Sequence, residues 1–123
     1  MKNYNLNLKT DIKKRSYLFA LDIIAFIEIL PKNQTNNIII NQLLRSATSI
    51  GANIIEAQAS SSKKDFINFY HHSLKSANET KFWLCLLRDS KKSDYNKTQK
   101  LLNEVIELAN ILGSSILTMK GKK

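Results

Sequence analysis

The sequence predicts an all-α fold, an antiparallel up-down-up-down four-helix bundle, on the basis of three observations. The 123-residue chain has one Pro and three Gly, so it contains few of the residues that end helices. Apolar residues dominate four long segments, and in the last three of them they recur three and four positions apart, which is the spacing of a buried helix face. The connections between these segments are short, which makes consecutive helices antiparallel. Because 43% of the residues are hydrophobic, a chain of this length is expected to form one domain over residues 1–123.

The first helix is predicted over about residues 10–30 and is stopped by Pro31. Within the run 17–30 only Asp22 and Glu28 are polar, so this helix is apolar around nearly its whole circumference. Such a helix needs burial on more than one side. The two acids, and the absence of a small-residue cleavage site after the run, favour a bundle helix over a signal peptide. The run is also too short to cross a bilayer.

The remaining helices are predicted over about residues 38–59, 63–88 and 95–119, followed by a basic tail at 120–123. Ser62 and Asp65 have the spacing of a capping box at the start of the third helix. The polar string between the third and fourth helices breaks the apolar periodicity and offers several capping residues.

Gly51 lies near the centre of the second helix, although Gly in a helix interior costs about 1 kcal/mol relative to Ala. If the second and third helices form a hairpin that turns at Ser61 and Ser62, residues at equal height have numbers that sum to about 124. Gly51 then faces Ser73, and small residues meet in the middle of the interface. The hypothesis is that Gly51 allows the two backbones to approach closely.

A stripe of polar residues lies on the second helix, with its members alternately four and three positions apart. The stripe consists of Gln42, Ser46, Ser49, Asn53, Glu56 and Ser60. The sum of about 124 for residues at equal height, which we call the height rule, places Arg45, which lies beside this stripe, level with Glu79. A guanidinium and a carboxylate at these positions can pair in bidentate fashion. A solvated face is one interpretation. A partly buried hydrogen-bonding stripe is favoured, because exposed faces usually carry more Lys and Glu than Ser and Asn.

These two helices resemble the bacterial four-helix bundle family of 23S rRNA intervening-sequence proteins, which also includes the accessory variability proteins of diversity-generating retroelements. The pattern R-S-x-x-S-I-x-x-N-I-x-E is met by Arg45, Ser46, Ser49, Ile50, Asn53, Ile54 and Glu56, and it continues with Asp65, Phe66, Glu79, Thr80, Trp83 and Leu84. Many members have Glu-Gly where this chain has Glu56-Ala57. The similarity spans roughly residues 17–117.

The resemblance implies a homopentameric ring of four-helix protomers, in which neighbouring subunits cover the apolar first helix and the polar stripe. For the retroelement branch of the family it also implies binding of nucleic acid and of a reverse transcriptase. The residues assigned structural or interface roles are Gln42, Arg45, Ser46, Ser49, Gly51, Asn53, Glu56, Glu79 and Trp83.

The formal net charge of +9 suits a polyanionic partner such as RNA or DNA, with simple solubility as the alternative explanation. In an up-down bundle, one end holds the start of the first helix, the connection between the second and third helices, and the end of the fourth helix. The candidate nucleic-acid contacts at this end are Lys9, Lys13, Lys14, Arg15, Lys63, Lys64, Lys120, Lys122 and Lys123. The opposite end is also basic, but less so. Because no base-reading motif is present, little sequence preference is expected.

No catalytic arrangement is recognisable, and we expect a protein that is not an enzyme and has no cofactor, metal, small-molecule substrate or membrane partner. His71 and His72 are adjacent and therefore point about 100° apart on a helix, so they cannot chelate one metal together. Cys85 is the only cysteine, which excludes an intramolecular disulfide and indicates a cytoplasmic protein.

The sequence therefore predicts a non-catalytic, homo-oligomeric scaffold that binds RNA or DNA through a basic ring. The alternative is a protein-binding adaptor that engages a partner enzyme such as a reverse transcriptase. A helical partner within a nucleotidyltransferase-type toxin system is a third possibility.

Overall fold

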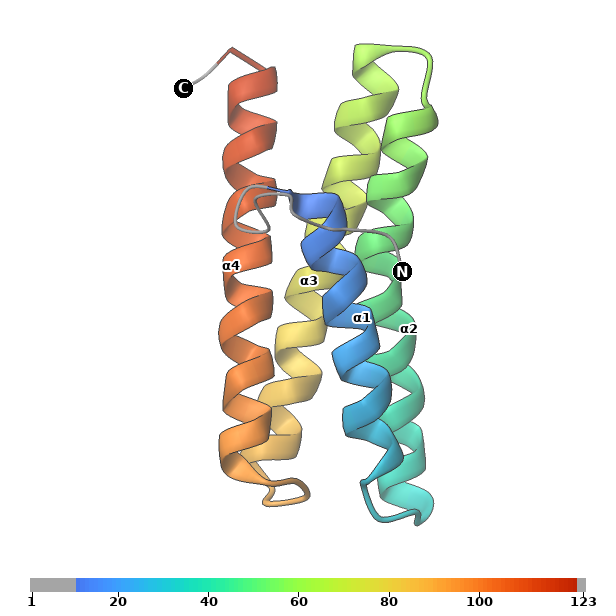
Figure 1. Cartoon of the computed structure of the whole chain (residues 1–123), viewed down its shortest axis with the longest axis vertical. Helices are drawn as coiled ribbons and strands as arrows, with labels where there is room; N and C mark the ends of the chain where they lie inside the picture. Colours follow the sequence, from blue (N-terminus) through green and yellow to red (C-terminus); the bar gives the residue numbers. More distant parts are fainter. Residues whose placement is uncertain (1–10, 122–123) are drawn as a thin grey trace, which may run out of the picture.

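A computed structural model of the chain, which describes residues 11–121, has four helices that run alternately up and down (Figure 1). They are α1 (Ile12–Glu28), α2 (Gln34–Ala59), α3 (Lys63–Asp89) and α4 (Tyr95–Met119). The described residues contain no strand. The predicted all-α, antiparallel four-helix bundle is confirmed.

Each helix is preceded by a capping residue whose side chain accepts a hydrogen bond from a backbone N–H in the first turn. These capping residues are Asp11, Asn33, Ser62 and Asp94. The predicted cap at Ser62 is therefore confirmed. In contrast, α2 begins at Gln34, four residues before the expected start at residue 38, because Asn33 caps a polar first turn that carries no apolar signal.

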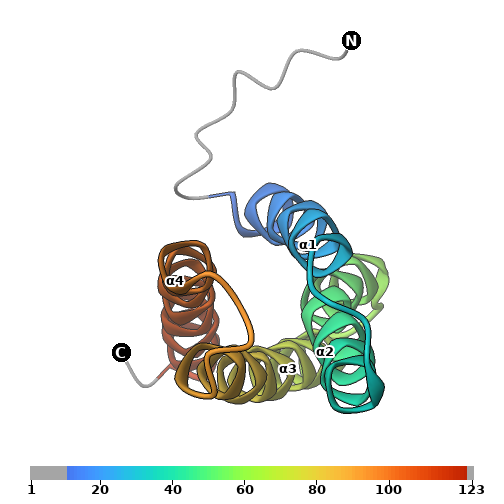
Figure 2. The same ribbon diagram turned by 90° about the horizontal axis from the view of Figure 1, so that it is seen from below.

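Viewed along the bundle, helices that are consecutive in sequence are neighbours in space, and α1 and α4 lie on either side of the remaining gap (Figure 2). The packing of α3 against α2 and against α4 is extensive, whereas α1 and α4 make the smallest interface. Because α1 has 17 residues and α3 has 27, α1 is about 15 Å shorter at 1.5 Å per residue. It therefore starts well short of the end where α2 and α3 are joined (Figure 1).

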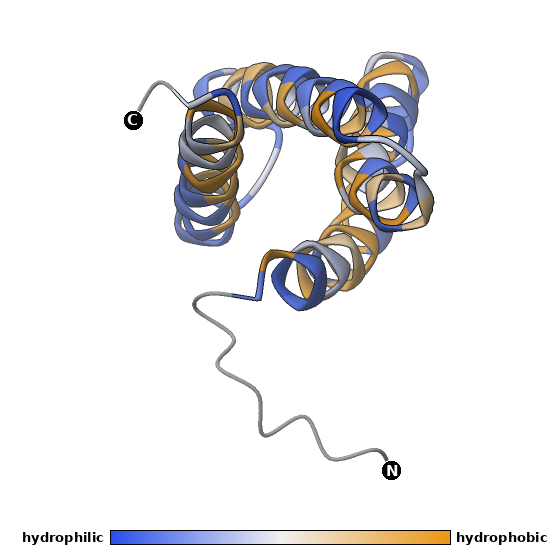
Figure 3. Ribbon diagram, turned by 90° about the horizontal axis from the view of Figure 1, so that it is seen from above, coloured by the Kyte–Doolittle hydropathy of each residue, from blue (hydrophilic) through white to orange (hydrophobic). Residues whose placement is uncertain are grey.

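The core lies between the four helices, and hydrophobic positions recur on their inward sides (Figure 3). The largest fully buried apolar side chains are Phe19, Ile23, Leu43, Ile50, Ile54, Leu84, Leu87, Val105, Leu108 and Leu112. By length and hydropathy alone α4 could cross a membrane. Its apolar side chains, however, include three of the fully buried core residues, which accounts for that hydropathy within a bundle.

The structure places Ser73 level with Gly51 as predicted, but it corrects the expected reason for the glycine. A Cβ atom placed on Gly51 would lie 3.1 Å from Oγ of Ser16, so the close neighbour of Gly51 belongs to α1. Ser73 instead donates a hydrogen bond of 2.8 Å to the backbone carbonyl of Ile50. The close approach that Gly51 permits is therefore that of α1 to α2, whereas Ser73 of α3 lies against the peptide bond that joins Ile50 to Gly51.

Tyr70 of α3 gives a prediction about alkaline stability. Its side chain is buried and stacked on Phe66 with ring centroids 4.8 Å apart, and burial raises the pKa of the phenol. At a pH below the ordinary tyrosine value of about 10, the phenol is neutral in both the folded and the unfolded state, so the full stability is present. Above that pH the unfolded chain ionises more readily than the folded chain, so stability is lost as the pH rises through the folded pKa.

We therefore expect the free energy of unfolding of Tyr70→Phe to fall less steeply than that of the wild type between about pH 9 and 11. Urea denaturation at three pH values measures this difference. Tyr95→Phe is the matched control, since Tyr95 is 61% exposed. Parallel pH dependences in the wild type and Tyr70→Phe would contradict the assignment.

Candidate nucleic-acid interface

Three of the predicted cationic contacts converge at the end of the bundle where α3 begins and α4 ends. Lys63 and Lys64 form the start of α3, and Lys120 is the residue that caps the end of α4. All three are exposed, and none of them forms an ion pair with another residue in the range 11–121. The short connections predicted this meeting correctly.

The three lysines line one open groove with a volume of about 680 Å³, which we call the basic groove. Its walls are formed by Lys63, Lys64, Ile67, Asn68, His71, Met119 and Lys120, and no carboxylate is among them. The acid nearest in sequence is Asp65, which is exposed in the first turn of α3. The lining of the groove therefore combines three cations with the apolar side chains of Ile67 and Met119 and the imidazole of His71.

The structure places two of the other predicted contacts, Lys13 and Lys14, elsewhere. Lys13 and Lys14 are in the first turn of α1, which starts short of this end, so they are not part of the basic groove. This is a correction to the expectation that the start of the first helix shares the end. Lys9, Lys122 and Lys123 lie outside the described residues.

Arg15, another predicted contact, is not an accessible cation. Its side chain is 12% exposed and forms a bidentate pair with Glu104, with Nε 3.0 Å from Oε2 and Nη2 2.7 Å from Oε1. Nη2 also lies 2.8 Å from Oε1 of Glu107. The hydrogen bond to Glu104 is the main reason that the pKa of Arg15 is raised above its ordinary value. Arg15 thus joins α1 to α4 and is not positioned to bind a phosphate.

At the opposite end of the bundle, two of the cations are engaged within the chain. Nζ of Lys32 donates to the backbone carbonyls of Ile27 and Leu30, which satisfies the end of α1. Arg88 pairs with Asp89, and the hydrogen bond between them is the main reason that the pKa of Asp89 is lowered. Lys91, Lys92 and Lys100 are exposed there and provide a comparison set for the basic groove.

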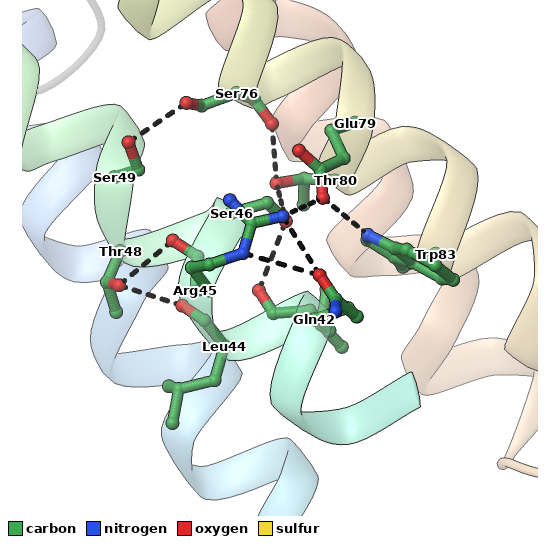
Figure 4. Close-up of polar contacts among 11 residues, drawn as sticks. Gln42, Leu44, Arg45, Ser46, Thr48, Ser49, Ser76, Glu79, Thr80 and Trp83 are labelled. Atoms are coloured by element: carbon green, nitrogen blue, oxygen red, sulfur yellow. Dashed lines mark hydrogen bonds and ion pairs between the residues drawn. The ribbon is translucent and has the colours of Figure 1, made fainter. Parts of the chain in front are cut away.

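The predicted polar stripe lies against α3 and is partly buried (Figure 4), which confirms the hydrogen-bonding interpretation. Thr80 donates 2.8 Å to Oγ of Ser46, and both side chains are buried. Ser76 donates 2.9 Å to Oγ of Ser49, which also accepts from Nδ2 of Asn53 at 3.0 Å. These five residues form a polar seam between α2 and α3. Part of the predicted stripe is therefore covered by α3 of the same chain.

The predicted pairing of Arg45 with Glu79 is present at the edge of this seam (Figure 4), but through the single contact of Nη2 with Oε2 and not in the predicted bidentate form. Gln42 accepts from Arg45, and Trp83 donates from its indole N–H to Glu79 at 3.0 Å. Because Arg45 is 59% exposed, the pair contributes modestly to stability. Glu56 is exposed near the end of α2.

The two histidines face different surfaces, as their sequence positions predicted. His71 lines the basic groove, whereas His72 lines a groove of about 480 Å³ beside the polar seam, together with Lys75 and Glu79. Across residues 11–121, no group of three or more His, Cys, Asp and Glu side chains is arranged to hold a metal ion.

Sequence reasoning did not predict that residues other than lysines line the basic groove. Lys64, Ile67, Asn68 and His71 are spaced three and four apart and therefore share one face of α3. This spacing was available in the sequence. What it did not reveal is that the face is left open beside the end of α4.

Comparisons with known proteins agree with this architecture. A family model described as 23S rRNA-intervening sequence protein matches residues 9–114. The crystal structure of a protein of unknown function from the S23 ribosomal protein family of Bacteroides thetaiotaomicron is 38% identical, with a TM-score of 0.80. The match covers 85% of this chain and 97% of that one. No match was found among curated proteins.

Proposed function

This chain belongs to the 23S rRNA-intervening sequence protein family, and we propose that it is a non-catalytic, homo-oligomeric scaffold that binds RNA or DNA through its basic groove. The observation that carries the proposal is the convergence of Lys63, Lys64 and Lys120 on one groove without a lining carboxylate. Clustered cations of this kind attract the phosphate backbone regardless of base sequence. The proposed location is the cytoplasm.

Assembly into a ring, with a pentamer expected from the family resemblance, is supported by the outer surface of α1. Tyr17, Leu21 and Ile24 are 60%, 46% and 38% exposed and follow the spacing of one helix face. Clusters of exposed apolar side chains mark surfaces that associate. In a ring with cyclic symmetry, every protomer would present its basic groove on the same face.

The test compares two triple variants that remove the same charge from opposite ends of the bundle. Lys63→Gln/Lys64→Gln/Lys120→Gln is expected to weaken binding of generic RNA and DNA by about tenfold or more at about 50 mM salt, and to reduce the salt dependence. Lys91→Gln/Lys92→Gln/Lys100→Gln is the control and is expected to bind nearly as the wild type does. Binding is measured by fluorescence anisotropy at about 50 and 200 mM salt.

No binding by the wild type at about 50 mM salt would reject the scaffold proposal. Equal losses in both triple variants would reject the basic groove as its location. Binding with a shallow salt dependence that neither triple variant changes would favour the adaptor alternative, in which the ring engages a protein such as a reverse transcriptase. Sedimentation analysis checks the assembly, for which we expect a multiple of the 14.1 kDa chain mass, and a mass equal to one chain would overturn it.

A further inference from the structure

The basic groove contains more than a phosphate site requires. Phosphate binding without sequence preference needs only cations, which Lys63, Lys64 and Lys120 supply. Besides these lysines, however, the groove is lined by the apolar side chains of Ile67 and Met119 and by the imidazole of His71.

His71 is placed to contact a ligand in this groove. It lies one helical turn after Ile67 on the same face of α3, and it is only partly buried. No hydrogen bond from the described residues engages its ring. Asn68 beside it offers both a donor and an acceptor to a polar edge.

The combined chemistry matches that of an unpaired nucleotide. A base has flat apolar faces that stack on aromatic side chains, including His, and a polar edge that accepts and donates hydrogen bonds. Its phosphate is anionic. In a duplex the base faces are stacked on one another, so a duplex could use the lysines but not the apolar and imidazole lining of the groove.

We propose that the basic groove binds unpaired nucleotides of a single-stranded nucleic acid, with His71 against a base and the lysines on the flanking phosphates. This inference rests on the proposed function and specifies its ligand. Stacking of this kind is tolerant of sequence, since every base has a π-face.

The experiment compares one labelled single strand of about 12 nucleotides with the duplex of the same sequence, at equal salt, on the full-length protein. We expect the wild type to bind the single strand at least about fivefold more tightly than the duplex. We expect His71→Ala to lose about 5- to 100-fold in single-strand affinity with an unchanged salt slope, and His71→Phe to restore most of it.

His72→Ala is the matched control, because His72 is the neighbouring residue and lines the other groove. It is expected to bind within about twofold of the wild type, since it removes the same atoms from a surface outside the basic groove. Circular dichroism of each variant checks that the helices remain folded.

Equal or tighter binding of the duplex by the wild type would overturn the proposal without the use of any variant. A His71→Ala protein that binds like His72→Ala would overturn it as well. If the lysine triple variant still weakens binding in either case, the nucleic-acid function stands and only the single-strand inference fails. If the wild type binds neither probe at low salt, both fail.

Discussion

Gly51→Leu is expected to destabilise the protein by about 1–3 kcal/mol, whereas Gly113→Ala is expected to stabilise it by about 0.5–1 kcal/mol. Both glycines lie inside long helices, Gly51 in α2 and Gly113 in α4. They therefore carry a similar helix-propensity penalty relative to Ala. What distinguishes them is the space around the missing Cβ atom.

A Cβ atom on Gly51 would lie 3.1 Å from Oγ and 3.6 Å from Cβ of Ser16. Ser16 is 1% exposed and its hydroxyl is bonded to the backbone carbonyl of Lys13, so it has little room to move. A leucine at Gly51 must push α1 away from α2, and overpacking of this kind destabilises a tightly packed interface. At Gly113 no atom lies within 4 Å of the added Cβ, so only the gain in helix propensity remains.

Urea denaturation of the two variants and the wild type measures both effects. Gly51→Ala is expected to lie between the wild type and Gly51→Leu, because the single methyl group gains propensity but crowds Ser16. A Gly51→Leu protein as stable as the wild type would show that α1 does not pack closely on α2. A destabilised Gly113→Ala protein would show that its surroundings are not open.

The position of Gly51 illustrates which part of the fold follows from periodicity and which does not. Spacing of three and four identifies residues that share a helix face, and the height rule gave the levels of α2 and α3 correctly. The pairs of Arg45 with Glu79 and Ser49 with Ser76 agree with it within one residue. Which neighbour covers a given face is a separate question, because α2 contacts both α1 and α3.

The same distinction applies to the candidate site. The meeting of Lys63 and Lys64 with Lys120 followed from the short connections, which fix the helix ends that share one side of the bundle. The misplacement of Lys13 and Lys14 came from the length of α1, which falls about 15 Å short of α3. The sequence indicated how far α1 extends but not that the other helices would project beyond it.

Arg15→Met is expected to destabilise the protein by about 1–3 kcal/mol, because it leaves two carboxylates without their cation at the smallest helix interface of the bundle. Methionine preserves most of the aliphatic stem, so the loss reports on the charge and its hydrogen bonds. Arg88→Met is the control. Arg88 pairs with Asp89, its neighbour in the chain, which is 66% exposed, so Arg88 is expected to contribute less than Arg15 does.

A double-mutant cycle separates the two carboxylates that contact Arg15. Glu104 is 33% exposed and receives two hydrogen bonds from Arg15, whereas Glu107 is 65% exposed and receives one. The coupling of Arg15→Met with Glu104→Gln is therefore expected to exceed its coupling with Glu107→Gln, because solvent screens the more exposed pair. Equal couplings, or equal losses for Arg15→Met and Arg88→Met, would contradict this account.

The same variant distinguishes a structural arginine from a nucleic-acid contact. If Arg15 acts only by joining α1 to α4, Arg15→Met should bind RNA and DNA within about twofold of the wild type under conditions where it remains folded. A drop in the salt dependence by about one unit would mean that Arg15 contacts a phosphate. Such a result would mean that the guanidinium leaves both carboxylates when nucleic acid binds.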